Sequence, residues 1–146
     1  MQAVVFDLDQ TIFGANRALR EGVAELLEIL NKLGLAIGAI TNRDHRAIVQ
    51  LDEAGVRHHF RYIICSDHMP VPKSPGAMER LLARLEVEPH QVVLVSNLYS
   101  DIVLGKKSGV AKTVGVSRGV EHSTVLRAAG ADHIVEDIPA VLDVIQ

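Results

Sequence analysis

Short apolar runs alternate with amphipathic stretches along the whole chain. Six runs are typical of buried strands, at residues 3–6, 35–40, 62–65, 91–95, 113–116 and 133–135. The stretches between them carry apolar residues at helical spacing, at residues 21–33, 44–54, 74–85, 101–108 and 123–129 and from 139 onward. Strands separated by helices indicate βαβ units. We therefore predict an α/β fold, a three-layer α/β/α sandwich with a mostly parallel sheet.

Length and composition narrow the class of protein. The 146 residues suit one domain, residues 1–146, and 48% hydrophobic content with 3% aromatic residues predicts an aliphatic core. No apolar stretch approaches the roughly 20 residues of a membrane span, and no basic segment precedes the first apolar run as in a signal peptide. A single cysteine, Cys65, excludes an internal disulfide. These features predict a cytoplasmic protein without a membrane partner.

The charge balance argues against a nucleic-acid partner. Fifteen basic residues face 18 acidic ones, which gives a formal net charge of −3, and no basic run stands out. A surface that binds phosphate backbones needs clustered Lys and Arg. We therefore expect no nucleic-acid-binding patch.

Polar side chains follow the C-terminal ends of the predicted strands. The set comprises Asp7, Asp9, Thr11, Thr41, Asn42, Arg43, Ser66, Asp67, Ser96, Asn97 and, one helical turn later, Asp101. Open α/β sheets bind their ligands at the carboxyl ends of the strands. We therefore expect these side chains to share one crevice, although they are scattered in sequence.

The residue types in this set suit phosphoryl transfer. The carboxylates of Asp7 and Asp9 repel each other, and a hard cation such as Mg²⁺ offsets that repulsion while accepting carboxylate, amide and carbonyl oxygens as ligands. Thr41 offers a hydroxyl and Lys73 a positive charge to the oxygens of a bound phosphoryl group. One aspartate can be the nucleophile that forms an aspartyl phosphate, and the other the general acid and base.

Four segments, in this order, resemble the motifs of the haloacid dehalogenase-like (HAD) phosphohydrolase superfamily. They are Asp7-Leu8-Asp9-Gln10-Thr11, which matches DxDxT, then Thr41, then Lys73, then Ser96-Asn97-Leu98-Tyr99-Ser100-Asp101 at the place of GDxxxD. The resemblance covers essentially the whole chain and is to a capless core like that of phosphoglycolate phosphatase-like members. It implies a Rossmann-like core and a Mg²⁺-dependent phosphoric monoester hydrolase.

The resemblance also implies a role for each motif residue. Asp7 is expected to be the nucleophile and Asp9 the acid and base, with Thr41 and Lys73 holding the phosphoryl oxygens. The expected metal ligands are Asp7, Asp9 through its backbone carbonyl, Asn97 and Asp101. The expected substrate-binding residues are Thr41 and Lys73, to which we add Asn42 and Arg43 because they follow Thr41 directly.

Departures from the motifs leave a second function open. Asn97 stands where the family has a metal-binding Asp, so the site loses one negative charge while it keeps an oxygen. Ser96 and Gln10 stand where glycine is common, which is expected to alter loop geometry. The alternative function is therefore a catalytically weakened HAD-fold binding or regulatory module. Asp101 also suits an ordinary first-turn helix position, and Thr41-Asn42 an ordinary helix cap.

The spacing between the motifs leaves no room for a cap domain. Residues 12–40 separate the first two motifs and residues 42–72 the next two, and each stretch is used by one helix and one strand. An open site suits a large phosphorylated substrate, or coverage by a neighbouring subunit of a homo-oligomer. A receiver domain is disfavoured because Ser117-Arg118 offers no lysine after the fifth strand. A true dehalogenase is disfavoured because Asp9 would have no acid role.

Overall fold

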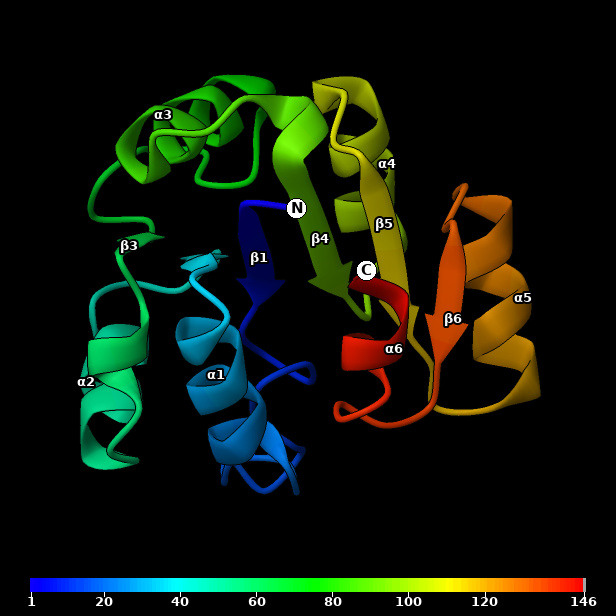
Figure 1. Ribbon diagram of the computed structural model, residues 1–146, viewed down its shortest axis with the longest axis horizontal. Helices are drawn as coiled ribbons and strands as arrows, with labels where there is room; N and C mark the ends of the chain where they lie inside the picture. The colour runs from blue at the N-terminus through cyan, green and yellow to red at the C-terminus, as the bar shows by residue number, and fades with distance from the viewer. Residues whose placement is uncertain (146) are drawn as a thin grey trace.

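The computed structural model describes residues 1–145, and its centre is a six-stranded parallel sheet (Figure 1). The strands are β1 (Ala3–Asp7), β2 (Ala36–Ile40), β3 (Tyr62–Ile64), β4 (Val92–Ser96), β5 (Lys112–Val116) and β6 (His133–Val135). Their order is β3-β2-β1-β4-β5-β6, and every neighbouring pair is parallel. The predicted three-layer α/β/α architecture is confirmed.

Helices cover both faces of the sheet. They are α1 (Val23–Lys32), α2 (Arg46–Glu53), α3 (Pro75–Leu85), α4 (Tyr99–Ser108), α5 (Val120–Ala128) and α6 (Val141–Ile145), with short 3₁₀ helices at Arg57–His59 and Pro89–Gln91. The first two helices and α6 pack on one face, and α3, α4 and α5 on the other (Figure 1). Two helices begin earlier than the pattern predicts, α4 at Tyr99 and α5 at Val120. None of the described helices combines the length and apolarity that crossing a membrane requires.

Strand β1 is buried on both faces, as a central parallel strand is expected to be. Because side chains alternate along a strand, Val4 and Phe6 pack toward α1 whereas Ala3 and Val5 pack toward α3. Asp7 continues the second series and so points to the same face as α3 and α4.

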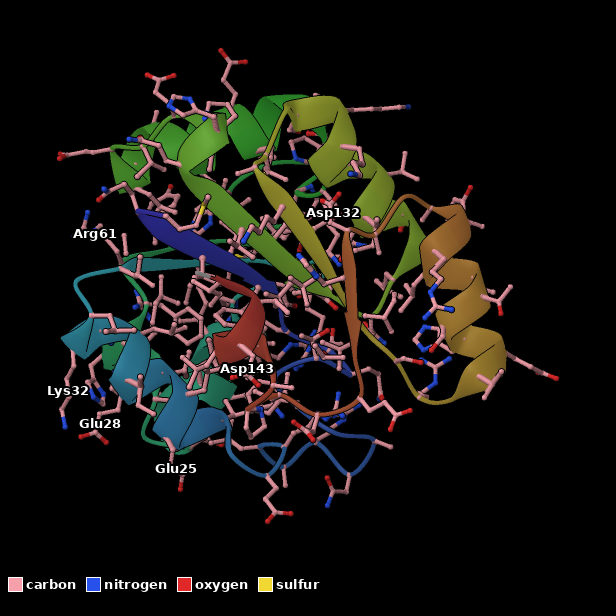
Figure 2. The ribbon with its side chains drawn as sticks, turned by 45° about the vertical axis from the view of Figure 1, so that its right-hand side comes forward. Glu25, Glu28, Lys32, Arg61, Asp132 and Asp143 are labelled. Atoms are coloured by element: carbon pink, nitrogen blue, oxygen red, sulfur yellow. The ribbon has the colours of Figure 1, made fainter. Side chains whose placement is uncertain are left out.

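Helix α1 shows the amphipathic pattern that its sequence predicts. Leu26, Leu27 and Leu30 are buried against the sheet. Glu25, Glu28 and Lys32 point away from the sheet into solvent (Figure 2). Burial of the leucine face is what fixes this helix, because the exposed Glu28–Lys32 pair at 3.1 Å contributes little in water.

Helix α4 approaches the sheet closely at Gly105. A Cβ atom at this position would lie 2.6 Å from Leu94 Cδ2 and 3.0 Å from Thr113 Cγ2. Glycine permits this approach without a shift of the side chains of Leu94 and Thr113. The contact fixes α4 over β4 and β5 and so fixes the position of its first turn, which carries Asp101.

The strand order reverses between β1 and β4. The chain steps outward from β1 through β2 to β3, returns to β4 beside β1, and then steps outward to β6. In open α/β sheets a crevice forms at the carboxyl ends of the strands at such a switch point. Asp7 ends β1 and Ser96 ends β4, so the predicted site lies at the switch point.

Candidate active site

A buried lysine joins two buried aspartates at the centre of the site. Lys73 Nζ donates to Asp7 Oδ1 at 2.7 Å and to Asp101 Oδ2 at 2.8 Å. The side chain of Lys73 is 9% exposed, and those of the two aspartates 2% and 1%. Lys73 comes from the loop before α3 and Asp101 from α4, and both helices lie on the face toward which Asp7 points. One ammonium group thus joins two carboxylates that lie 94 positions apart in the chain.

Burial sets the protonation chemistry of this cluster. It raises the pKa of the Asp7 carboxyl from 3.8 to about 6, and the charges of Asp101 and Asp9 add to the rise, whereas Lys73 opposes it. Burial alone would lower the pKa of the Lys73 ammonium, but the two carboxylates outweigh it and raise that pKa. Lys73 therefore stays charged and stabilises the ionised form of Asp7.

Asp9 occupies a different environment from Asp7. Its side chain is 47% exposed, and its Oδ1 accepts from an Arg43 guanidinium nitrogen at 3.0 Å. The same nitrogen donates to Gln50 Oε1 at 2.8 Å. Asp7 therefore lies buried at the strand end while Asp9 faces the opening of the crevice, which is the arrangement needed when one carboxylate attacks and another exchanges protons with solvent or a leaving group.

The Asn97 side chain lies between the first two aspartates. Its inward-facing amide atom is 3.1 Å from Asp7 Oδ2, 3.3 Å from the Asp9 carbonyl oxygen and 3.2 Å from Thr11 Oγ1. If that atom is the amide nitrogen, its two N–H groups have three acceptor oxygens within reach; if it is the amide oxygen, four oxygens converge. The second arrangement is an oxygen-only set of the kind that Mg²⁺ prefers.

With the Asn97 amide oxygen turned inward, the candidate ligands would offer a magnesium ion mixed oxygen types. Among residues 1–145, no three His, Cys, Asp or Glu side chains are grouped as a metal centre. The set instead combines the Asp7 carboxylate, the Asp9 carbonyl and the Asn97 amide. Asp101 contacts Lys73 and Ser96, and its role as a metal ligand stays a prediction.

Thr41 and Asn42 lie at the same edge of the sheet, directly after β2. Thr41 is buried, and its Oγ1 accepts from the Arg43 backbone N–H at 3.1 Å. Asn42 is exposed and lines a crevice of about 530 Å³ together with Arg43. The Thr41 hydroxyl thus holds its own turn, and its contact with a phosphoryl group stays a prediction.

The two positions where the family commonly has glycine behave differently. Gln10 has a left-handed backbone conformation, with φ of 64°. Glycine adopts this conformation without strain, whereas the Cβ atom of glutamine makes it strained. Ser96 gains two contacts: its Oγ donates to Asp101 Oδ2 at 2.7 Å and accepts from the Leu98 N–H at 3.1 Å. The serine therefore orients Asp101 toward Lys73.

Two further residues support the site without a recognisable sequence signal. The nitrogen Nε2 of His122, on α5, lies 2.8 Å from the Asn97 carbonyl oxygen, and Nδ1 accepts from the Arg118 N–H at 3.0 Å. Gln50, on α2, fixes the guanidinium of Arg43. Their roles depend on the packing of distant helices, which no local spacing reveals.

The chain is similar in sequence to phosphoglycolate phosphatases. Phosphoglycolate phosphatase of Pseudomonas fluorescens (strain Pf0-1) is 30% identical over 140 residues, which cover 90% of this chain and 51% of that protein. Phosphoglycolate phosphatase of Pseudomonas savastanoi pv. phaseolicola is 33% identical over 128 residues, which cover 84% and 47%. The chain thus spans about half the length of the curated relatives it matches.

A solved structure and a family model extend the likeness. The structure of a HAD phosphatase from Thermococcus onnurineus superposes with a TM-score of 0.83, at 17% identity, over 99% of this chain and 98% of that one, which shows the shared fold. Residues 15–116 match the family model described as haloacid dehalogenase-like hydrolase, and this stretch holds Thr41, Lys73, Asn97 and Asp101. The chain belongs to the haloacid dehalogenase-like hydrolase family.

Proposed function

We propose that this protein is a Mg²⁺-dependent phosphatase that hydrolyses a phosphate monoester through an aspartyl-phosphate intermediate. The observation that carries the proposal is the contact between Lys73 Nζ and Asp7 Oδ1, at 2.7 Å, in a buried strand end with the exposed Asp9 two residues later. The phosphoglycolate phosphatases among the relatives support a phosphorylated small molecule as substrate.

The first half-reaction transfers the phosphoryl group to Asp7. A carboxylate oxygen of Asp7 forms a bond to phosphorus while the bond from phosphorus to the leaving oxygen breaks, and Asp9 gives its proton to that oxygen. Lys73 and Thr41 are placed to hold the phosphoryl oxygens, with Asn42 and Arg43 as further substrate contacts. Lys73 also favours the ionised nucleophile against the effect of burial.

The second half-reaction releases phosphate. Asp9, now a carboxylate, takes a proton from water as the water oxygen attacks phosphorus, and the bond from phosphorus to Asp7 breaks. Mg²⁺, when bound by Asp7, the Asp9 carbonyl and Asn97, would neutralise negative charge between the carboxylate and the phosphoryl oxygens. Asp101 and Ser96 hold Lys73 in position throughout.

The proposal is tested with 4-nitrophenyl phosphate and added Mg²⁺. Asp7→Asn is expected to lower the rate at least about a thousandfold, because the amide is a poor nucleophile. Asp52→Asn, on the exposed side of α2, removes the same charge and should leave the rate unchanged. Equal rates for wild type and Asp7→Asn would exclude the covalent mechanism. Rapid acid quenching and mass spectrometry should find one phosphoryl group on the peptide that contains Asp7.

The position of Asn97 favours a second candidate, a binding or regulatory module without turnover. With its amide nitrogen turned inward, Asn97 donates to the Asp7 carboxylate and the Asp9 carbonyl, so neither needs a cation. Tight binding of a phosphometabolite without hydrolysis, in wild type and in Asn97→Asp alike, would establish this candidate. Hydrolysis by wild type would exclude it.

A further inference from the structure

A crevice continues from the active site on the side of Asp9. Asp9 and Phe13 line a hollow of about 360 Å³ together with Arg17 and Arg43. The same two arginines also line the neighbouring crevice of about 530 Å³. In the proposed reaction Asp9 protonates the leaving oxygen, so the rest of the leaving group must lie on this side.

Of the arginines that line this crevice, two have carboxylate partners among residues 1–145 and one has none. Arg46 is engaged by Asp44, through contacts of 2.8 to 3.1 Å to both carboxylate oxygens. Arg43 contacts the exposed Asp9. The Arg17 side chain has no hydrogen bond or ion pair to any of residues 1–145, and it lines both hollows. Arg17 therefore contributes a positive charge that the described protein does not neutralise.

The backbone at Arg17 is held in a strained conformation. Its φ is 64°, in the left-handed region that disfavours residues with a Cβ atom. Two backbone hydrogen bonds close the turn, Arg17 N–H to Gly14 O and Gly14 N–H to Ala18 O, both at 2.9 Å. Gln50 Nε2 donates to the Arg17 carbonyl at 2.7 Å, while its Oε1 accepts from Arg43. One glutamine thus ties the positions of both arginines together.

We propose that Arg17 and Arg43 form a subsite for a second anionic group, a carboxylate or phosphate carried by the leaving group of the substrate. The inference rests on the proposed phosphatase function and adds a substrate class to it. Guanidinium groups pair with carboxylate and phosphate oxygens through directed, often bidentate hydrogen bonds. Arg17 is the specificity residue, because its charge is free for the ligand.

The test compares three esters of one size class: ethyl phosphate, phosphoglycolate and ethylene glycol bisphosphate. The second replaces the methyl group of ethyl phosphate by a carboxylate, and the third extends the chain by a phosphate. The enzymes are wild type, Arg17→Gln and Arg127→Gln, all with Mg²⁺. Gln keeps a Cβ at the left-handed position, so the backbone strain is unchanged. Arg127, exposed on α5, is the control for net charge.

We expect wild type to prefer at least one anionic ester over ethyl phosphate by about tenfold or more in kcat/KM. Arg17→Gln should reduce that preference about tenfold, mainly through KM, and Arg127→Gln should preserve it. The ester whose advantage over ethyl phosphate falls in Arg17→Gln shows whether the subsite binds a carboxylate or a phosphate. Hydrolysis of all three esters without preference, or an equal loss for all three in Arg17→Gln, would overturn the subsite and leave the phosphatase intact.

Binding measurements separate the two proposals if no ester is hydrolysed. That result refutes the phosphatase function, and calorimetry with the same esters then decides the subsite. Tighter binding of an anionic ester than of ethyl phosphate, weakened in Arg17→Gln, supports the subsite. Equal binding of all three, or no binding, overturns it.

Discussion

Replacement of Asp7 by asparagine should stabilise the metal-free protein, and the stabilisation should grow as the pH rises. Burial raises the pKa of the Asp7 carboxyl to about 6, against 3.8 in an unfolded chain, despite the nearby Lys73. The folded protein therefore holds this proton more tightly than the unfolded chain does. Near pH 8 both states have lost the proton, and the difference of roughly two pKa units corresponds to a cost of about 3 kcal/mol to the folded state.

The sign of the pH dependence follows from that shift. Because the pKa is higher in the folded state, the native carboxyl is protonated at pH 4.5 and adds a cost of only about 1 kcal/mol there. The cost grows as the pH passes through 6 and is complete near pH 8. Asparagine resembles the protonated carboxyl and never ionises. The stability advantage of Asp7→Asn should therefore widen by about 2 kcal/mol between pH 4.5 and pH 8.

Urea unfolding in EDTA at the two pH values measures this difference directly. Wild type and Asp7→Asn share every other titrating group, so the change in their stability gap reports on Asp7. Asp52→Asn is the control, since its side chain is exposed on α2 and its gap to wild type should stay constant. A gap for Asp7→Asn that is constant, or that narrows toward pH 8, would show that Lys73 outweighs burial and would refute the reasoning.

Four further substitutions test other parts of the structure. Asn97→Asp adds a carboxylate to the inward-facing oxygens, so calorimetry should show Mg²⁺ binding about tenfold tighter or more, with a lower melting temperature for the metal-free variant; unchanged affinity would place the ion elsewhere. Gln10→Gly relieves a φ of 64° and should raise the free energy of unfolding by about 1 kcal/mol, as should Glu86→Gly, remote from the site at φ of 59°. Gly105→Ala puts a Cβ 2.6 Å from Leu94 and should lower that free energy by about 1–3 kcal/mol in urea unfolding; a more stable variant would mean that α4 shifts freely.

The sequence predicts the layered fold and the edge of the sheet that carries the site because both depend on local periodicity. A parallel strand buried on both faces must be continuously apolar, so residues 3–6 and 91–95 stand out, and the polar residue that ends each run marks a carboxyl end. In the structure, alternation along β1 places Asp7 on the face of α3 and α4, where Lys73 contacts both Asp7 and Asp101. Which helices cover that face depends on the strand order, which the periodicity of the chain does not reveal.

The remaining contacts depend on distances between elements that no spacing in the chain encodes. Gln50 reaches Arg43 because α2 lies beside the loop that follows β2, and His122 reaches Asn97 because α5 begins at Val120, three residues earlier than its apolar pattern predicts. Neither residue belongs to a motif, and each acts through directed hydrogen bonds that a shift of one turn would remove. For the same reason, the sequence indicates only that Asn97 removes one negative charge from the site and does not reveal the contacts of its side chain. In the structure the inward atom of its amide lies among three oxygens. The amide nitrogen finds acceptors there without a metal, whereas the amide oxygen would be suited to a bound cation, so the substitution replaces a fixed carboxylate by a group that can serve either state.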